Sequence, residues 1–272
     1  MTQVTSSGQA AGSHWDPHQY LRFSDHRLRP ALELLDRVNH QAPQVVYDLG
    51  CGTGQITSLM AGRWPGAKVY GLDNSREMLD AAGKLPGSVQ WIEADIATWE
   101  PAERPDIIYS NATLQWVEGH EVLFPRLAGF LKPGGVLAVQ MPLSWGMPSH
   151  RLMRETLADG GPKGTPLGPE SLRREMARDW VPQGPVYYDW LVGKTTGLDI
   201  WSTEYLQVLQ GPDPVLEWVK GTGLRPALLG LQEAERATFL AEYTKRLRAA
   251  YPLRPDGCTV YPFLRLFMVA TV

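Results

Sequence analysis

The feature that most constrains the fold is a short apolar run that leads directly into a glycine-rich turn. Residues 45–49 read VVYDL, and GCGTG follows at 50–54. A short, β-branched apolar run is typical of a strand buried in a parallel sheet. Glycine tolerates positive φ and lets a ligand lie against the backbone. Because residues 55–62 can form a helix whose first N–H groups point into the turn, the sequence predicts an α/β fold with a ligand bound there.

The glycine spacing and one acid narrow the choice of ligand. A dinucleotide fingerprint is G-x-G-x-x-G, with the pyrophosphate on the helix N-terminus. Here the spacing is G-x-G-x-G, and Asp48 lies two residues before Gly50. A carboxylate at that position repels a pyrophosphate but can pair with a cationic amino-acid moiety. S-adenosylmethionine carries an ammonium, a carboxylate and a sulfonium but no phosphate, so it suits this turn.

Two further strand-like segments, 67–73 and 89–96, bring acids to the same edge. Asp73 has the spacing from the glycine turn that suits acceptance of both ribose hydroxyls, although it can also be interpreted as a helix N-cap. Asp95 can accept a hydrogen bond from the exocyclic amine of adenine while Ile96 packs on the ring, and an ordinary loop aspartate is the alternative. The three acids together favour a ligand that contains a nucleoside.

The rest of the chain predicts a doubly wound, mostly parallel sheet of seven strands, with a helical cap inserted late in the chain. The turn after the fourth strand, NATLQW at 111–116, is expected to face the transferred group, although it can also be an ordinary asparagine turn. A Gly- and Pro-rich segment at 159–169 favours a mobile loop. The expected strands are 45–49, 67–73, 89–96, 105–110, 136–141, 198–208 and 263–272. The expected regions are a disordered tail (1–13), lid helices (14–43), a cofactor-binding core (44–145), acceptor-side loops and helices (146–196), and the last two strands (197–272) with the cap insertion (211–255).

Composition limits the kinds of partner that the protein is expected to bind. The chain has 272 residues, a net charge of −3 and no basic run, which disfavours nucleic-acid binding. No apolar segment is long enough to span a bilayer, and the N-terminus lacks the apolar core of a signal peptide. Neither the two cysteines nor the histidines have metal-ligand spacing, so no metal is expected.

These motifs resemble those of class I S-adenosylmethionine-dependent methyltransferases, over about residues 45–141. A closer resemblance, to the family of trans-aconitate 2-methyltransferases, covers nearly the whole chain and includes segments that the generic fold does not require. The matching segments are WxPxxYLxF at 15–23, RxRP at 27–30, RWP at 63–65, NATLQW at 111–116, LAVQMP at 137–142, TGLRP at 222–226 and RLFMVA at 265–270.

The resemblance implies a cytoplasmic enzyme that methylates one carboxylate of trans-aconitate and releases a monomethyl ester and S-adenosylhomocysteine. It implies cofactor contacts from Trp15, Tyr20, Asp48, Gly50, Gly52, Asp73, Asn74, Met78, Asp95, Ile96, Asn111 and Ala112. Carboxylates of this kind are already ionised at neutral pH, so no general base is expected. His120 and His150 are interpreted as helix-start or surface histidines.

The acceptor needs groups that position it and bind its remaining carboxylates. Gln115 and Trp116 are expected to position it, and arginine forks suit the binding of carboxylates. The candidates for binding are Arg29, Trp145, Arg225 and Arg265, although each arginine can equally form a surface salt bridge.

Three other hypotheses stay open at this point. The chain can be a class I methyltransferase for another small-molecule hydroxyl, amine or carboxylate. It can be an oxidoreductase with a nicotinamide cofactor, although Asp48 and the glycine spacing argue against that. It can also be a regulatory subunit that binds the cofactor without catalysis. A monomer or weak homodimer is expected.

Overall fold

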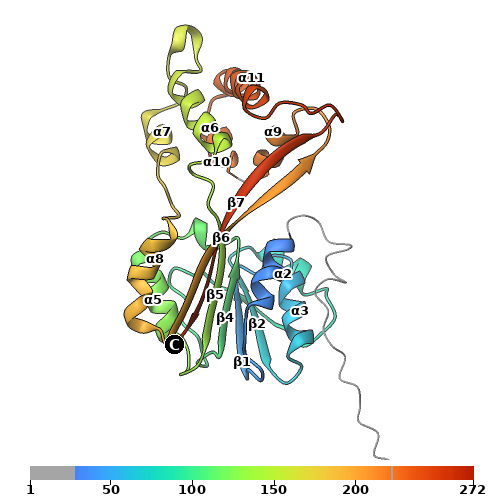
Figure 1. Cartoon of the computed structure of the whole chain (residues 1–272), viewed down its shortest axis with the longest axis vertical. Helices are drawn as coiled ribbons and strands as arrows, with labels where there is room; N and C mark the ends of the chain where they lie inside the picture. Colours follow the sequence, from blue (N-terminus) through green and yellow to red (C-terminus); the bar gives the residue numbers. More distant parts are fainter. Residues whose placement is uncertain (1–27, 222) are drawn as a thin grey trace, which may run out of the picture.

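The centre of the molecule is a seven-stranded sheet (Figure 1). The computed structural model describes residues 28–221 and 223–272. The strands follow the order β3-β2-β1-β4-β5-β7-β6, and β7 alone runs in the direction opposite to the other strands. The predicted doubly wound, mostly parallel fold is therefore confirmed. The strands are β1 (Val45–Leu49), β2 (Lys68–Asp73), β3 (Gln90–Glu93), β4 (Ile107–Asn111), β5 (Val136–Pro142), β6 (Gly197–Leu209) and β7 (Thr259–Thr271).

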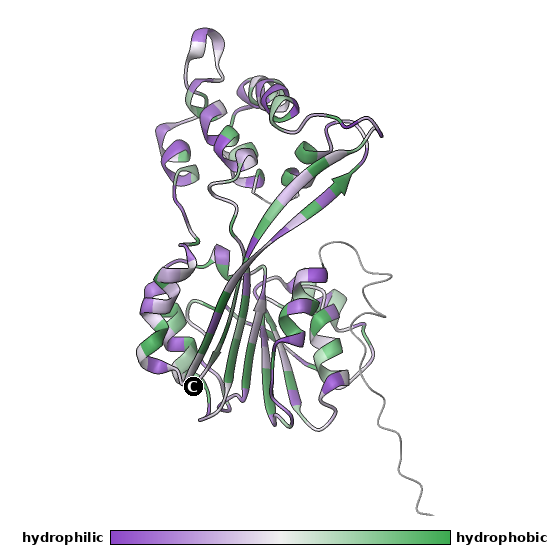
Figure 2. Cartoon of the chain, in the orientation of Figure 1, coloured by the Kyte–Doolittle hydropathy of each residue, from purple (hydrophilic) through white to green (hydrophobic). Residues whose placement is uncertain are grey.

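Helices cover both faces of the sheet (Figure 1). One face carries α2 (Arg29–Asp36) and α3 (Gln55–Arg63), and the other carries α5 (His120–Phe130) and α8 (Gly184–Leu191), while α4 (Arg76–Ala82) follows β2. Alternate residues of β1, β4 and β5 enter two different buried clusters, one with α2 and α3 and one with α5 and α8. The central strands are accordingly hydrophobic along their length (Figure 2). Burial on both faces is the reason that these strands show no polar alternation.

A second lobe, the cap, stands on a long hairpin formed by β6 and β7, which run beyond the sheet (Figure 1). The cap has its own apolar cluster, which includes Phe239, Tyr243 and Leu247. Its helices are α6 (Pro148–Asp159), α7 (Glu170–Met176), α9 (Pro214–Lys220), α10 (Arg225–Gly230) and α11 (Glu233–Ala250). The cap therefore combines the predicted late insertion with an earlier segment between β5 and β6, which the sequence interpretation did not assign to it.

The Gly- and Pro-rich segment 159–169 differs from its prediction as a mobile loop. It contains a 3-10 turn at Pro162–Gly164, and the Leu167 amide donates to the Leu157 carbonyl at 2.8 Å. Leu167 is buried in the cap cluster, and the Gly168 amide donates to Glu235 at 2.8 Å. The segment is thus fastened to α11. Local composition gave no indication of the contact with α11 because Glu235 lies 67 residues from Gly168 in the sequence.

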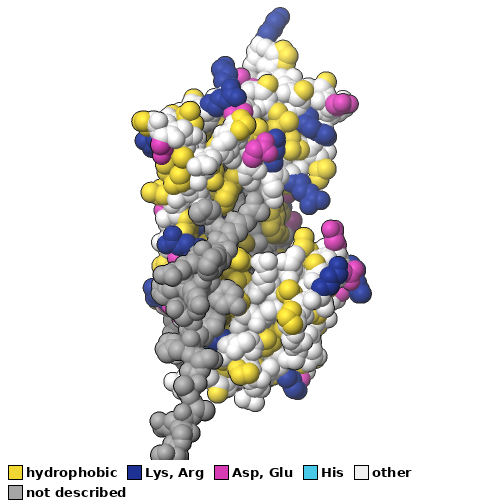
Figure 3. Space-filling view, turned by 90° about the vertical axis from the view of Figure 1, so that its right-hand side faces the viewer, with side chains coloured by type: hydrophobic (Ala, Val, Ile, Leu, Met, Phe, Trp, Pro, Cys, Tyr) yellow, Lys and Arg dark blue, Asp and Glu magenta, His cyan; other side chains and the backbone are white. Residues whose placement is uncertain are grey.

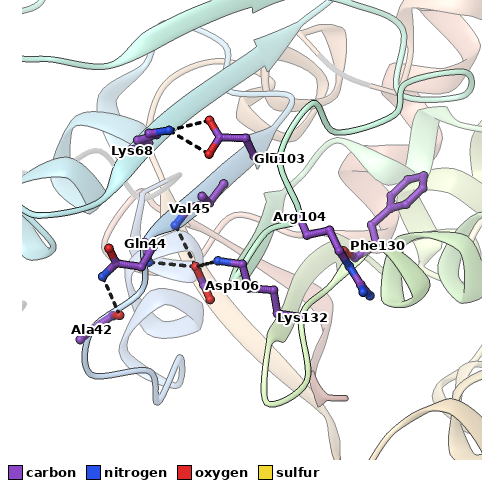
Figure 4. A network of polar contacts seen from close by, with 9 residues as sticks. All are labelled: Ala42, Gln44, Val45, Lys68, Glu103, Arg104, Asp106, Phe130 and Lys132. Atoms are coloured by element: carbon purple, nitrogen blue, oxygen red, sulfur yellow. Dashed lines mark hydrogen bonds and ion pairs between the residues drawn. The ribbon is translucent and has the colours of Figure 1, made fainter.

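One acid at the opposite edge of the sheet, Asp106, has a purely structural environment (Figure 4). Its Oδ2 accepts hydrogen bonds from the backbone N–H groups of Gln44 and Val45, both at 2.9 Å, and from Lys132 at 2.8 Å. Burial by itself would raise the pKa of Asp106, but these hydrogen bonds and the Lys132 charge outweigh it and lower the pKa. Asp106 therefore ties the amino ends of β1 and β4 together.

Charged side chains on the face shown in Figure 3 stand in small groups, with acidic side chains beside basic ones. In the part of the chain that the structure describes, no helix combines the length and the apolar character needed to cross a bilayer. Within the same residues, no group of three His, Cys, Asp or Glu side chains is arranged to hold a metal ion.

Candidate active site

The turn after β1 has the open backbone that its glycines predict. Gly50, Gly52 and Gly54 have φ of 75°, 53° and 77°, in the left-handed region where L side chains are strained. At Gly50 an added Cβ would lie 2.1 Å from the Thr113 side chain, so the turn packs tightly against the end of β4. At Gly52 an added Cβ would have no atom within 4 Å. The backbone at Gly52 therefore borders free space that a ligand can occupy.

Asp48 lies under this turn and is only 2% exposed. The Thr57 hydroxyl, on α3, donates to its Oδ2 at 2.6 Å. Burial raises the pKa of Asp48 to about 7, and the neighbouring charge of Asp73 adds to the rise, while the Thr57 hydrogen bond opposes it. Burial likewise raises the pKa of the Cys51 thiol, so that this cysteine is a poor nucleophile and serves as a small turn residue.

The raised pKa of Asp48 predicts a pH-dependent stability. The unfolded carboxyl ionises near the ordinary aspartate pKa of 3.8, whereas the folded one holds its proton until about pH 7. The folded state therefore binds more protons in this window, and the free energy of unfolding should fall by up to about 4 kcal/mol between pH 4 and 7 because of this group. Asp48→Asn should remove that slope, as measured by urea unfolding of both proteins from pH 4.5 to 7.5.

Asp106→Asn is the matched control for this prediction. The pKa of Asp106 is lowered, so its carboxyl is ionised in the folded state across this range. Its substitution should therefore change stability by a similar amount at each pH. Parallel curves for wild type and Asp48→Asn would contradict the assignment of a protonated Asp48.

Asp73 supports the glycine turn directly. Its Oδ2 accepts from the Gly52 N–H and its Oδ1 from the Ser75 N–H, both at 2.9 Å. The alternative interpretation of Asp73 as an N-cap is wrong, because Ser75 is the N-cap of α4 and accepts from the Met78 N–H. Each Asp73 oxygen keeps a lone pair for a further donor such as a ribose hydroxyl. Asn74 is exposed beside it, and Met78 is exposed in the first turn of α4.

Asp95 and Ile96 follow β3 but have different environments. Asp95 is exposed, and its Oδ1 accepts from the Ala97 N–H at 2.9 Å, which is the local contact expected of a loop aspartate. Its Oδ2 leaves room for another donor. Ile96 is buried in the cluster beneath α5, so it has little surface left for an adenine ring.

The turn after β4 holds an unusual backbone conformation. Ala112 has a φ of 54°, its N–H donates to the Gln140 carbonyl at 2.9 Å, and its own carbonyl accepts from Gln115 Nε2 at 2.8 Å. Such strain persists where the surrounding structure enforces it, and it is common at functional sites. Gln115 thus holds the turn, while Trp116 is 60% exposed at its rim. Asn111 Oδ1 and Gln115 Oε1 are buried and have no hydrogen-bond partner among the described residues.

A row of polar side chains crosses three adjacent strands beside this turn. Asn111 on β4 is the register partner of Gln140 on β5, and Arg265 on β7 donates from Nη1 to Gln140 Oε1 at 3.2 Å. Arg265 is only 7% exposed, and its guanidinium lies 4.7 Å from the centre of the Phe263 ring. The sequence interpretation missed Gln140, although a lone amide inside the apolar run VLAVQMP at 136–142 is an indication of function.

Arg29 approaches the same region from α2. It pairs with Glu33 at 2.7 Å and lies 5.1 Å from the centre of the Tyr205 ring, whose hydroxyl donates to Glu33. Burial and Glu33 raise the pKa of Tyr205, whereas the charges of both Arg29 and Arg265 act against the rise. Of the four predicted acceptor-binding residues, Arg29 therefore stacks on the Tyr205 ring, and Arg265 is near enough for its charge to act on the same phenol.

The other two predicted acceptor-binding residues lie on different elements. The Trp145 indole N–H donates to the Ala177 carbonyl at 3.2 Å, and the Arg154 guanidinium stacks on its ring at 3.9 Å. Arg225 is exposed at the first residue of α10. Trp15 and Tyr20 lie outside the described residues.

Both candidate histidines are held in neutral networks. His120 does begin α5, but it is buried: its Nε2 donates to the Leu114 carbonyl at 2.8 Å, and its Nδ1 accepts from Tyr187 at 2.7 Å. His150 lies in the first turn of α6, which confirms its interpretation as a helix-start histidine, and it is half-buried between Ser144 and Ser149, at 3.2 Å from each. Burial lowers the pKa of His120, and burial with the Arg154 charge lowers that of His150 to about 4. Neither ring is poised as a base near pH 7.

Solved structures share this fold at low sequence identity. The YcgJ protein from Bacillus subtilis matches with a TM-score of 0.56 and 13% identity, covering 90% of this chain and 98% of that one. The phosphoethanolamine N-methyltransferase 2 of Haemonchus contortus matches with a TM-score of 0.50 and 16% identity, covering 89% of this chain and 52% of that one. These likenesses show the fold alone.

A family model described as a methyltransferase domain matches residues 46–135, which hold the glycine turn and all three acids. With the strand order and the open turn, this match defines a class I methyltransferase, the class that takes its methyl group from S-adenosylmethionine.

Relatives with similar sequences identify the family within that class. A trans-aconitate 2-methyltransferase from Azoarcus sp. (strain BH72) is 46% identical over 94% of this chain and 98% of its own. One from Streptomyces avermitilis is 48% identical over 96% of this chain and 98% of its own. The chain belongs to the trans-aconitate 2-methyltransferase family.

Proposed function

We propose that this enzyme transfers the methyl group of S-adenosylmethionine to one carboxylate oxygen of trans-aconitate. The observation that carries the proposal is the buried Arg265 guanidinium, which lies beside the carboxyl end of β5, at the edge of the sheet where ligands of such folds bind. A buried arginine fork suits a planar carboxylate. The names of relatives at 44–48% identity support the same acceptor.

The residues around the glycine turn fit the proposed methyl donor. The bound donor supplies an electrophilic methyl group on a sulfonium. The free space beside Gly52 would accept its amino-acid end, and the spare lone pairs of Asp73 would accept hydrogen bonds from the ribose hydroxyls. The buried Asn111 Oδ1 has no hydrogen-bond partner among the described residues, and a positively charged group of the methyl donor would complete it. Ala112 would line the same side. Asn74, Met78, Asp95 and the edge of Ile96 would border the adenosine, and Trp15 and Tyr20 would cover the methionine end.

On the acceptor side, charge and position replace a base. A carboxylic acid with a pKa of about 4 is already ionised at pH 7, so the nucleophile needs no deprotonation. Arg265 and Arg29 would bind the carboxylates that do not react, and Arg225 and Trp145 would contribute from the cap. Gln115 fixes the Ala112 turn against which the acceptor lies, and Trp116 would shield it at the rim. Alignment in a water-poor pocket then provides the rate.

The broader organisation is part of the proposal. Residues 44–145 would bind the methyl donor, while 146–196 and the insertion 211–255 would bind the acceptor. The predicted lid, 14–43, is not proposed as a whole, because α2 within it is buried against a face of the sheet. The predicted tail, 1–13, lies outside the described residues. We also propose a cytoplasmic monomer or weak homodimer that acts on a small acid, and sedimentation velocity tests the oligomeric state.

The test of this function is an acceptor panel with labelled S-adenosylmethionine. Trans-aconitate should give a monomethyl ester by mass spectrometry, ahead of cis-aconitate, citrate and simple dicarboxylates. With both substrates saturating, kcat should stay within about twofold between pH 6 and 8.5, because no base has to ionise. Methylation of amines or phenols instead, with a rate that climbs with pH, would contradict the proposal. Calorimetry with NAD and S-adenosylhomocysteine is the control for the class of ligand.

A further inference from the structure

We propose that Gln140 is a positioning residue for the acceptor and that its Nε2 N–H donates a hydrogen bond to an acceptor carboxylate. This inference rests on the proposed function and refines it. Gln140 is fully buried in β5, at 0% exposure. Its side-chain nitrogen is buried too and has no hydrogen-bond partner among the described residues. A buried amide N–H without a partner is costly, which favours a ligand that completes it.

The orientation of the Gln140 amide is fixed by Arg265. Because a guanidinium can only donate, the amide atom that faces Arg265 Nη1 at 3.2 Å must be the oxygen. The NH₂ group therefore points to the other side of the amide.

The position of Gln140 within the row supports its role. Asn111 and Gln140 are register partners in parallel strands, and Gln140 pairs with Phe267, two residues from Arg265, so all three side chains share one face. Along the row, a hydrogen-bond acceptor on β4 (Asn111 Oδ1) is followed by a neutral donor on β5 and a cation on β7. This polarity matches a positive methyl donor on the β4 side and an anionic acceptor on the β7 side.

A purely structural role, in which Gln140 only orients Arg265, makes a different prediction. If Gln140 acts through Arg265 alone, its replacement should have no further effect once Arg265 is gone. If it contacts the acceptor itself, the effect should persist. Gln140→Met removes the donor with little change in volume, and it can be made in wild type and in an Arg265→Met background.

The experiment measures kcat/KM for trans-aconitate and the Kd of S-adenosylhomocysteine for the four proteins of this cycle. A hydrogen bond to a charged group corresponds to about 10- to 100-fold in KM, so Gln140→Met should raise KM by that factor. It should still lower kcat/KM about tenfold in the Arg265→Met background. The Kd of S-adenosylhomocysteine should change less than about threefold, within the usual scatter of such measurements.

Gln207→Met is the control, because Gln207 is also a buried strand glutamine but lies on the cap half of β6. It should leave KM unchanged. Gln140→Glu is the second variant: it keeps the oxygen facing Arg265 but replaces the donor with a negative charge, and it should raise KM more than Gln140→Met. An unchanged KM in both Gln140 variants, or no effect in the Arg265→Met background, would overturn the assignment alone. A wild-type enzyme that leaves trans-aconitate unmethylated would overturn the proposed function and this inference together.

Discussion

Replacing Arg265 with methionine is expected to raise KM for trans-aconitate at least about 100-fold, while the Kd of S-adenosylhomocysteine stays within about threefold of wild type. Arg265 is almost fully buried and held by Gln140 and Phe263, so its fork is already oriented when an anion arrives. A fixed, desolvated cation binds a carboxylate far more strongly than an exposed one. Steady-state kinetics with variable acceptor and calorimetry with S-adenosylhomocysteine provide the two measurements.

Substitutions of three other arginines provide comparisons for the effect of Arg265→Met on KM. Arg29 is more exposed and already shares its charge with Glu33, so Arg29→Met should raise KM by only about tenfold. Arg225→Met tests the proposed contribution from the cap. Arg248 pairs with Asp213 at the far side of the cap, and Arg248→Met should leave KM unchanged. If KM for the acceptor is unaltered in the Arg265 and Arg29 variants alike, the anion-binding role is wrong.

Gly50→Ala is expected to weaken S-adenosylhomocysteine binding at least about 100-fold and to lower the free energy of unfolding by about 2–4 kcal/mol. Two costs add at this position. The backbone has a φ of 75°, and the new Cβ would lie 2.1 Å from Thr113, so either the turn or the end of β4 must move. The glycine turn and the end of β4 both border the proposed site of the methyl donor. Calorimetry and urea unfolding measure the two effects.

Two alanine substitutions separate these costs. Gly52 also has positive φ, but its added Cβ would meet no atom within 4 Å. Gly52→Ala should therefore cost only about 1–2 kcal/mol of stability while still blocking the ligand. Gly62 lies inside α3 with free space around it, and Gly62→Ala should stabilise the protein by about 0.5–1 kcal/mol without affecting binding. Retention of normal S-adenosylhomocysteine affinity in both Gly50→Ala and Gly52→Ala would contradict the location of the site.

Much of the sheet could be predicted from sequence because its strands carry strong local patterns. The run VVYDL at 45–49 is β1 to the residue, since burial on both faces leaves it uniformly apolar. The prediction for β3 ran past its end at Glu93, because the turn at Asp95 continues an apolar pattern. The predicted start of the last strand at Phe263 was four residues late, since the first residues of β7 pair in the hairpin rather than in the central sheet.

The site was predictable where chemistry follows local spacing and unpredictable where it depends on contacts between distant elements. Asp48 and the glycines lie in one motif, and the fold places them together. The role inferred for Gln140 depends on its hydrogen bond with Arg265, which is 125 residues away in the sequence. His150 looks like a surface residue in isolation, and only the packing of the cap encloses it between two serines. The assignment of α6 and α7 to the cap likewise follows from packing, of α6 on α11 and of α7 on α6 and α10.

The hairpin of β6 and β7 has a mechanical consequence. Arg265 lies opposite Pro142, the last residue of β5, and Thr203 of β6, at the point where the two long strands leave the sheet (Figure 1). Because β6 and β7 are continuous from the sheet into the cap, a change in the angle of the cap would move the Arg265 guanidinium. Substitutions that change the angle of the cap would therefore change which acid the enzyme favours, while the half of the sheet that would hold the methyl donor stays in place.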